Sequence, residues 1–164
     1  MKEIKGKALK YFDNINTDII SPPAYMELSI SEAAKYAMST IDEDFSKKVA
    51  PGDIFVAENN LGSGSSRETA PLTLKELGIE AIVAKSFARI FYRNCINLGL
   101  LAIECDETDK IGYNDQLEIL ADKGLIINHT KNEQYSFSPI PKHILDLVTV
   151  GGLVESLKLK KAKN

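Results

Sequence analysis

Cysteine and histidine, which most often hold metal ions, are scarce in this sequence. The chain has two cysteines, Cys95 and Cys105, and two histidines, His129 and His143. The cysteines form no CxxC pair, and neither lies at metal-ligand spacing from a histidine. We therefore expect no zinc or iron–sulfur site built by this chain alone. Two reduced, buried thiols and two histidines without a catalytic role are the simpler interpretation.

Long apolar runs and an excess of basic residues are also missing. No apolar segment approaches the roughly 18–20 residues that cross a bilayer. The lysines of the first five residues are followed by no apolar stretch, unlike those of a signal peptide. The formal net charge of −3 argues against nucleic acid as the main partner, because phosphate binding needs a basic surface. These absences favour a cytoplasmic protein that binds neither membranes nor nucleic acids.

The composition is that of an ordinary globular chain. Of the 164 residues, 44% are hydrophobic and 26% are charged, which is sufficient for a folded core. We expect one domain over residues 1–164, because the length falls within the usual range of a single domain. The lysine-rich segment 159–164 is expected to form a flexible tail.

Strand-like and helix-like segments alternate through the first two thirds of the chain, a pattern that predicts a parallel sheet with helical crossovers. Alternating or continuous apolar runs predict strands at 3–12, 54–57, 79–84 and 100–104. Helices are predicted at 31–38, at 71–77, and from a cap at Ser86 to a stop at Gly99.

The last third has a different pattern, with short strands joined by turns. Strands are predicted at 116–120, 125–128 and 134–137, followed by a closing helix at 141–148. This pattern is typical of an antiparallel sheet. The sequence therefore predicts an α/β fold with a parallel layer, an antiparallel layer and helices.

The segment 59–71 (NNLGSGSSRETAP) carries the strongest chemical signal. It lies between a predicted strand and a predicted helix, and its two glycines allow backbone N–H groups to converge on an anion. Arg67 can hold a carboxylate with a bidentate fork, while Ser65 and Ser66 supply hydroxyl groups. The segment is neither a Walker A loop nor GxGxxG. A carboxylate therefore suits it better than a nucleotide, although such loops also occur as plain helix starts.

Two other segments leave the choice between function and structure open. Asp18, in the turn-forming segment 13–18, could orient a serine or arginine, or could simply build the turn. Arg89 and Arg93 lie four residues apart on a predicted helix, so they share one face. For this face a solvated or salt-bridged role is the simpler interpretation.

Four segments stand out in this order along the chain: 13–20 (DNINTDII), 62–68 (GSGSSRE), 86–94 (SFARIFYRN) and 151–154 (GGLV). Together they resemble the small subunits of the isopropylmalate isomerase family, which are similar to the C-terminal swivelling domain of aconitase. The resemblance spans nearly the whole chain and implies a three-layer β/β/α swivelling domain, with a parallel central sheet and a smaller antiparallel sheet.

The resemblance also implies a function shared between two polypeptides. The family moves a hydroxyl group between adjacent carbons of a 2-hydroxy dicarboxylic acid by dehydration and rehydration. A large subunit carries the [4Fe–4S] cluster, and the small subunit binds no cofactor itself. By this resemblance Ser65 is the base, and Arg67 and Asp18 complete the catalytic set. Ser66, Gly64 and Thr17 belong to the substrate-binding set.

The family's specificity loop corresponds here to Tyr25, Met26, Glu27 and Leu28. Aconitase-like and homoaconitase-like relatives place an arginine where this chain has Glu27, to hold an additional carboxylate. An acidic side chain would repel that carboxylate. The resemblance therefore implies a dicarboxylate with an apolar group, such as isopropylmalate in leucine biosynthesis.

Other functions remain open at this stage. A small subunit of a dimethylmalate-type, methylmalate-type or homoaconitase-like dehydratase would carry the same loop. A non-catalytic module that binds carboxylates through the glycine segment is the alternative from a different class.

Overall fold

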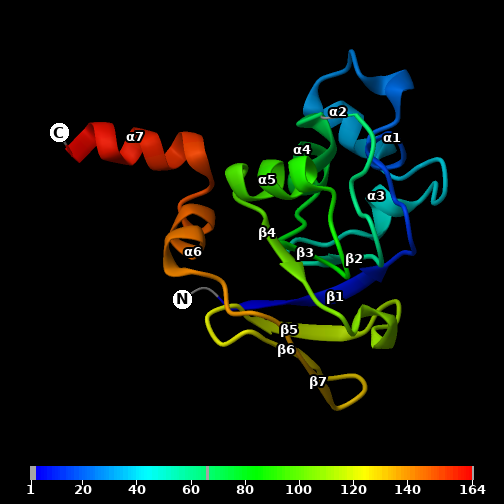
Figure 1. Cartoon of the computed structure of the whole chain (residues 1–164). Helices are drawn as coiled ribbons and strands as arrows, with labels where there is room; N and C mark the ends of the chain where they lie inside the picture. Colours follow the sequence, from blue (N-terminus) through cyan, green and yellow to red (C-terminus); the bar gives the residue numbers. More distant parts are fainter. Residues whose placement is uncertain (1–2, 66, 164) are drawn as a thin grey trace.

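The computed structural model describes residues 3–65 and 67–163, which form a mixed sheet and several helices (Figure 1). The strand order in the sheet is β4-β3-β2-β1-β5-β6-β7. Strand β1 pairs in parallel with β2 and antiparallel with β5, so it joins a parallel half to an antiparallel half. The strands are β1 (Ile4–Lys10), β2 (Ile54–Val56), β3 (Ala81–Ala84), β4 (Leu101–Glu104), β5 (Gln116–Leu120), β6 (Leu125–Asn128) and β7 (Glu133–Ser136).

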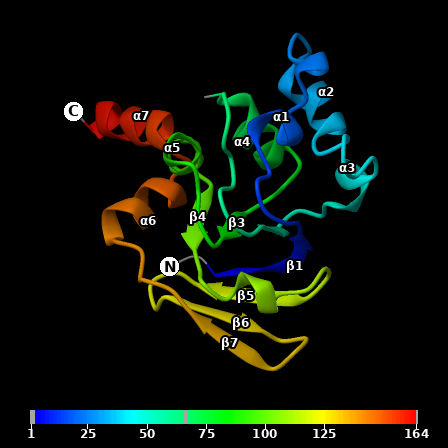
Figure 2. The ribbon, with the colours of Figure 1, turned by 45° about the vertical axis from the view of Figure 1, so that its right-hand side comes forward.

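The parallel half is buried on both faces, which explains its nearly continuous apolar strands. Neighbouring residues of β2 contribute to different cores: Phe55 packs on the helix side, whereas Ile54 and Val56 face the antiparallel strands. Leu117 of β5 and Ile126 of β6 pack against this second face. Figure 2 shows the resulting order of antiparallel strands, parallel strands and helices. The predicted three-layer β/β/α fold is therefore confirmed.

Helices cover the other face of the parallel half and extend beyond it at the C-terminus. No helix in residues 3–65 and 67–163 is long and apolar enough to cross a membrane. The helices are α1 (Thr17–Ile20), α2 (Ile30–Ala33), α3 (Phe45–Lys48), α4 (Thr69–Glu76), α5 (Arg89–Asn97), α6 (Lys142–Thr149) and α7 (Leu153–Lys163), with 3₁₀ turns at Pro23–Tyr25, Ala34–Tyr36 and Thr108–Lys110.

Two of the predicted helices differ from those in the structure. Ser86 does not cap α5, because the helix begins at Arg89 after Ala88 and its N-cap has no side-chain hydrogen bond. The Ser86 hydroxyl instead accepts a 2.8 Å hydrogen bond from the backbone N–H of Asn60. The expected helix at 31–38 is divided into α2 and a 3₁₀ turn.

The C-terminal residues continue as helix α7, which projects away from the sheet in both views of the ribbon (Figures 1 and 2). A helix after Gly152 was not expected from the sequence. A flexible tail over 159–164 stays a prediction, and within the described residues this segment is helical as far as Lys163.

Candidate functional site

The candidate site lies where the chain leaves the carboxyl ends of the parallel strands, the usual ligand-binding edge of such sheets. Three loops meet there through backbone hydrogen bonds. The N–H of Gly62 donates to the carbonyl of Ile15 at 2.8 Å, and that of Thr17 donates to Ser63 at 2.9 Å. The N–H of Leu61 donates to Ser86 at 3.0 Å. The segments after β1, β2 and β3 are thus held together at one edge.

The two glycines of the loop have distinct structural reasons to be glycine. Gly62 has a φ of +84°, and a Cβ placed on it would overlap the ring of Phe91 in α5. Gly64 has a φ of +98° and faces more open space, because the nearest atom to a Cβ added there would be Thr17 Oγ1 at 3.4 Å. Gly62 therefore allows the loop to pack closely on α5, whereas Gly64 mainly supplies the left-handed backbone conformation.

Helix α1 fixes the position of Ser65. Its N-cap is Asn16, whose side-chain oxygen accepts from the N–H of Ile19 at 2.8 Å. The next residue, Thr17, is 2% exposed, and its hydroxyl donates to the carbonyl oxygen of Ser65 at 2.9 Å. The capped turn after β1 thereby holds the backbone of the loop after β2.

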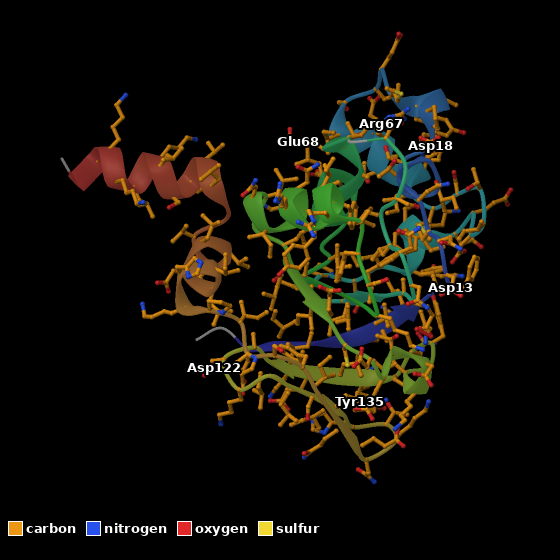
Figure 3. All side chains as sticks on the ribbon, in the orientation of Figure 1. Asp13, Asp18, Arg67, Glu68, Asp122 and Tyr135 are labelled. Atoms are coloured by element: carbon orange, nitrogen blue, oxygen red, sulfur yellow. The ribbon has the colours of Figure 1, made fainter. Side chains whose placement is uncertain are left out.

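Arg67 pairs with Asp18, at 3.2 Å between Nη1 and Oδ1 (Figure 3). The two atoms are close enough for an ion pair, but Nη1 has no aligned hydrogen bond to any of the described residues although it is buried. Asp18 is half-exposed and Arg67 is largely buried. A buried guanidinium nitrogen without a hydrogen bond is costly unless an acceptor is supplied. An incoming carboxylate would supply one.

A cavity of about 210 Å³ opens beside these residues. It is smaller than the pockets of about 300–1,000 Å³ that hold drug-sized ligands, so it fits a small metabolite. The cavity combines hydroxyl, amide and guanidinium groups with an apolar wall. Its described lining residues are Thr17, Gly62, Gly64, Ser65, Arg67, Ala88, Arg89, Ile90, Phe91 and Asn94.

Most of the residues expected from the glycine loop and the Thr-Asp turn come together here. Ser65, Arg67, Gly64 and Thr17 line the cavity, and Asp18 reaches it through its ion pair with Arg67. Their catalytic and binding roles stay predictions. Ser66, the other expected ligand of a substrate carboxylate, lies outside the described residues.

The expected specificity loop is not part of the cavity lining. Met26, Glu27 and Leu28 are exposed. Tyr25 stacks on Tyr36 with a ring separation of 3.9 Å, beside a separate hollow of about 480 Å³. The substrate-binding role of these four loop residues stays a prediction, and in this chain by itself they stand outside the cavity.

Helix α5 contributes lining residues that the sequence pattern did not single out as ligands. Arg89, Ile90 and Asn94 all face the cavity, whereas Arg93 does not line it. The sequence feature that pointed to this part of the chain was the SFAR segment, which ends at Arg89, the first residue of the helix. The sequence could not show which arginine faces the loop, because this depends on how α5 packs.

The two cysteines lie in different parts of the hydrophobic core. Cys95 lies in the core between sheet and helices, and Cys105 lies in the core between the two sheet halves. Burial raises the pKa of both thiols. In the described part of the chain, no group of three or more histidine, cysteine or acidic side chains could hold a metal ion. These residues do not fit an iron–sulfur cluster.

Together, the three-layer fold and the glycine-rich loop that carries Ser65 and Arg67 define an aconitase-type swivelling domain. The family of the aconitase C-terminal domain matches residues 1–108. The 3-isopropylmalate dehydratase small subunit of Brachyspira hyodysenteriae is 50% identical over 159 residues, covering 96% of this chain and 98% of that protein. Small subunit 1 from Archaeoglobus fulgidus is 48% identical over 93% of this chain and 96% of that protein.

The crystal structure of 3-isopropylmalate dehydratase from Methanocaldococcus jannaschii superposes with a TM-score of 0.93 at 44% identity, covering 98% of this chain and 96% of that chain. The chain therefore belongs to the family of 3-isopropylmalate dehydratase small subunits, within the aconitase superfamily of hydro-lyases.

Proposed function

We propose that this chain is the small subunit of a cytoplasmic two-subunit hydro-lyase that interconverts 2- and 3-isopropylmalate in leucine biosynthesis. The observation that carries the proposal is the cavity that both Ser65 and Arg67 line, where the buried Nη1 of Arg67 has no hydrogen bond to another described residue. The names of the relatives support the choice of substrate.

Arg67 is assigned to the first substrate carboxylate. Its guanidinium can offer two parallel N–H donors to a carboxylate. Asp18, 3.2 Å from Nη1, would keep the side chain pointed at the cavity before substrate arrives. Because Asp18 is half-exposed, water screens its charge, and Asp18 offsets the charge of Arg67 only in part.

Ser65 is assigned as the base that removes the proton from the carbon next to a carboxylate. A serine alkoxide is unstable at neutral pH unless N–H groups and positive charge surround it. Arg67 lines the same cavity, and Gly64 makes no hydrogen bond with another described residue, so its backbone N–H remains available. In the dehydration Ser65 Oγ would accept this proton, and in the rehydration it would return it.

The apolar part of the lining suits a branched hydrocarbon group. Ala88, Ile90 and Phe91 form a wall from α5 and the residue before it, and contact with an isopropyl group would remove apolar surface from water. Glu27 lies on the exposed loop that follows α1 in the sequence. Its negative charge would disfavour a third carboxylate if the loop closes on the substrate.

The proposal places the [4Fe–4S] cluster on a large subunit, because the described residues of this chain do not fit one. When bound there, the cluster iron would act as a Lewis acid on the hydroxyl group that leaves. Met26, Leu28 and Ile90 are exposed apolar side chains, two on the loop and one at the cavity. Exposed apolar groups of this kind suit a protein partner that closes over the site.

The experiment is anaerobic co-expression with the cognate large subunit, reconstitution of its cluster, and detection of the unsaturated intermediate by absorbance. Isopropylmalate, citramalate, dimethylmalate and citrate are compared. The proposal expects turnover of isopropylmalate and none of the tricarboxylate citrate. Turnover of dimethylmalate alone would show that dimethylmalate, and not isopropylmalate, is the substrate. A complex that binds dicarboxylates without turning any over would support a non-catalytic binding module.

A further inference from the structure

The cavity lining includes a second arginine, Arg89, that the assigned roles of Ser65, Arg67 and Asp18 leave unused. Arg89 is the first residue of α5, whereas Arg67 comes from the loop before α4. Both residues line the same cavity of about 210 Å³. Two arginines from separate elements thus converge on a space sized for one small molecule.

The charge of this lining is unbalanced. Among the ten described lining residues, two are arginines and none is acidic. Asp18 offsets Arg67 from outside the lining. For the side chain of Arg89 the structure records no ion pair and no hydrogen bond with any residue in 3–65 or 67–163. An arginine kept at a cavity without a protein partner is available for an anionic ligand.

We propose that Arg89 binds the second carboxylate of the substrate, the one that Arg67 does not hold. This assignment rests on the proposed function and extends it, because it makes this chain recognise both acidic ends of a dicarboxylate. The apolar residues Ala88, Ile90 and Phe91, which adjoin Arg89 in sequence and line the same cavity, then face the hydrocarbon part of the ligand. Arg89 acts as a binding and specificity group, and the proton transfer stays with Ser65.

Arg93 provides a matched comparison within the same helix. It lies one helical turn after Arg89, it is also exposed, and it does not line the cavity. Removing either side chain changes the net charge of the chain by the same amount. A difference between the two variants therefore reports on the cavity rather than on general electrostatic attraction of the substrate.

The test uses the reconstituted complex of this chain with its large subunit. Inhibition constants are measured for isopropylsuccinate, a dicarboxylate that cannot be dehydrated, and for its two half-amides. The wild-type complex is compared with Arg89→Ala, Arg89→Lys and Arg93→Ala. Thermal unfolding of each variant checks that the fold is intact, and the exposed position of Arg89 predicts unchanged melting.

The expected result is specific to one carboxylate. Arg89→Ala should weaken inhibition by the diacid about 10- to 100-fold, the range for losing one charge-assisted hydrogen-bonded contact. The diacid and one of the half-amides should inhibit this variant equally, because the Arg89 side chain that distinguishes a carboxylate from an amide has been removed. Arg89→Lys should recover part of the loss, and Arg93→Ala should stay within about twofold of wild type.

Two results would overturn the assignment while leaving the proposed function intact. In one, Arg89→Ala and Arg93→Ala change the inhibition constants equally, although the wild-type complex turns over isopropylmalate. In the other, Arg89→Ala keeps the wild-type preference for the diacid over both half-amides. Absence of isopropylmalate turnover in the wild-type complex would overturn the proposed function, and the Arg89 assignment with it.

Discussion

The hydroxyl of Thr17 donates a 2.9 Å hydrogen bond to the backbone carbonyl oxygen of Ser65. It links the turn after β1 to the loop after β2, across 48 residues of sequence. Thr17 is buried at 2% exposure, so water cannot replace the bond. The position of the proposed base therefore depends on a side chain that does no chemistry of its own.

Replacing Thr17 by valine should impair catalysis more than substrate affinity. Valine keeps the shape of threonine but leaves the Ser65 carbonyl without its buried donor, at a cost of about 1–3 kcal/mol. We expect kcat in the reconstituted complex to fall at least about tenfold, with a smaller change in KM. Thr17→Ser retains the hydroxyl and should keep most of the activity. Equal kcat values for the valine and serine variants would contradict this positioning role.

Asp18→Asn tests whether the ion pair with Arg67 serves activity or stability. Asp18 is half-exposed, and an exposed pair contributes little to folding, about 0–1 kcal/mol. We expect kcat/KM to fall about tenfold or more, because Arg67 loses its orienting partner, while the melting temperature barely changes. The control is Asp109→Asn, which breaks a similarly exposed pair with Lys85 at 3.3 Å, away from the cavity. Loss of activity in the control as well would show a general charge effect.

The two loop glycines should respond differently to alanine. In Gly62→Ala the new Cβ would collide with the ring of Phe91 and would occupy a left-handed backbone. We expect destabilisation of more than about 2 kcal/mol. Gly64→Ala meets only an ordinary contact with Thr17, so about 1 kcal/mol from backbone strain is expected, with a clear loss of turnover. Urea unfolding and turnover assays distinguish these outcomes, and equal stabilities of the two variants would contradict the packing role of Gly62.

Tyr11→Phe should remove an acid-sensitive part of the stability. The Tyr11 hydroxyl donates to Asp42 at 2.7 Å, and Lys48 donates to the same carboxylate at 3.0 and 3.1 Å. Burial alone would raise the pKa of Asp42, but the hydrogen bonds from Tyr11 and Lys48 outweigh it and leave the pKa lowered. The ionised carboxylate is therefore favoured in the folded state.

The pH dependence follows from this direction. The contribution of Asp42 is fully present above its unfolded pKa of about 3.9 and is lost as the pH falls through the lower folded pKa. At pH 7, Tyr11→Phe should lower the free energy of unfolding by about 1 kcal/mol, and the difference from wild type should shrink as the pH falls below about 4. Urea unfolding at several pH values measures both. A difference independent of pH would contradict the role of Asp42.

The local sequence was sufficient to predict much of the fold. Strands β5 and β6 begin and end where the alternating pattern and its turns predicted, because both signals act over a few residues. The cap at Ser86 was predicted wrongly, since its hydroxyl is used by Asn60 from another loop. The single sheet shared by both halves depends on β1 pairing with distant strands, which no local pattern encodes.

The candidate site, like the fold, could be predicted from the sequence only in part. Ser65, Arg67 and the glycines could be identified as an anion-binding loop because they are contiguous in sequence. The sequence could not show which of Arg89 and Arg93 lines the cavity, because the two lie four residues apart on one predicted helix face. Only the packing of α5 on the loop distinguishes them. The specificity loop, Tyr25 to Leu28, was placed by resemblance, and in the described structure it lies away from the cavity.

The most direct test of the proposed function is a single-turnover comparison of wild type with Ser65→Ala in the complex with the large subunit. Isopropylmalate would be labelled with deuterium at the carbon that loses the proton. If Ser65 is the base, the alanine variant should still bind isopropylmalate with an affinity within about threefold of wild type, while the rate of deuterium loss falls by at least about 100-fold. A variant that exchanges the label at the wild-type rate would show that the proton goes to another group, and the central role of this chain in catalysis would be refuted.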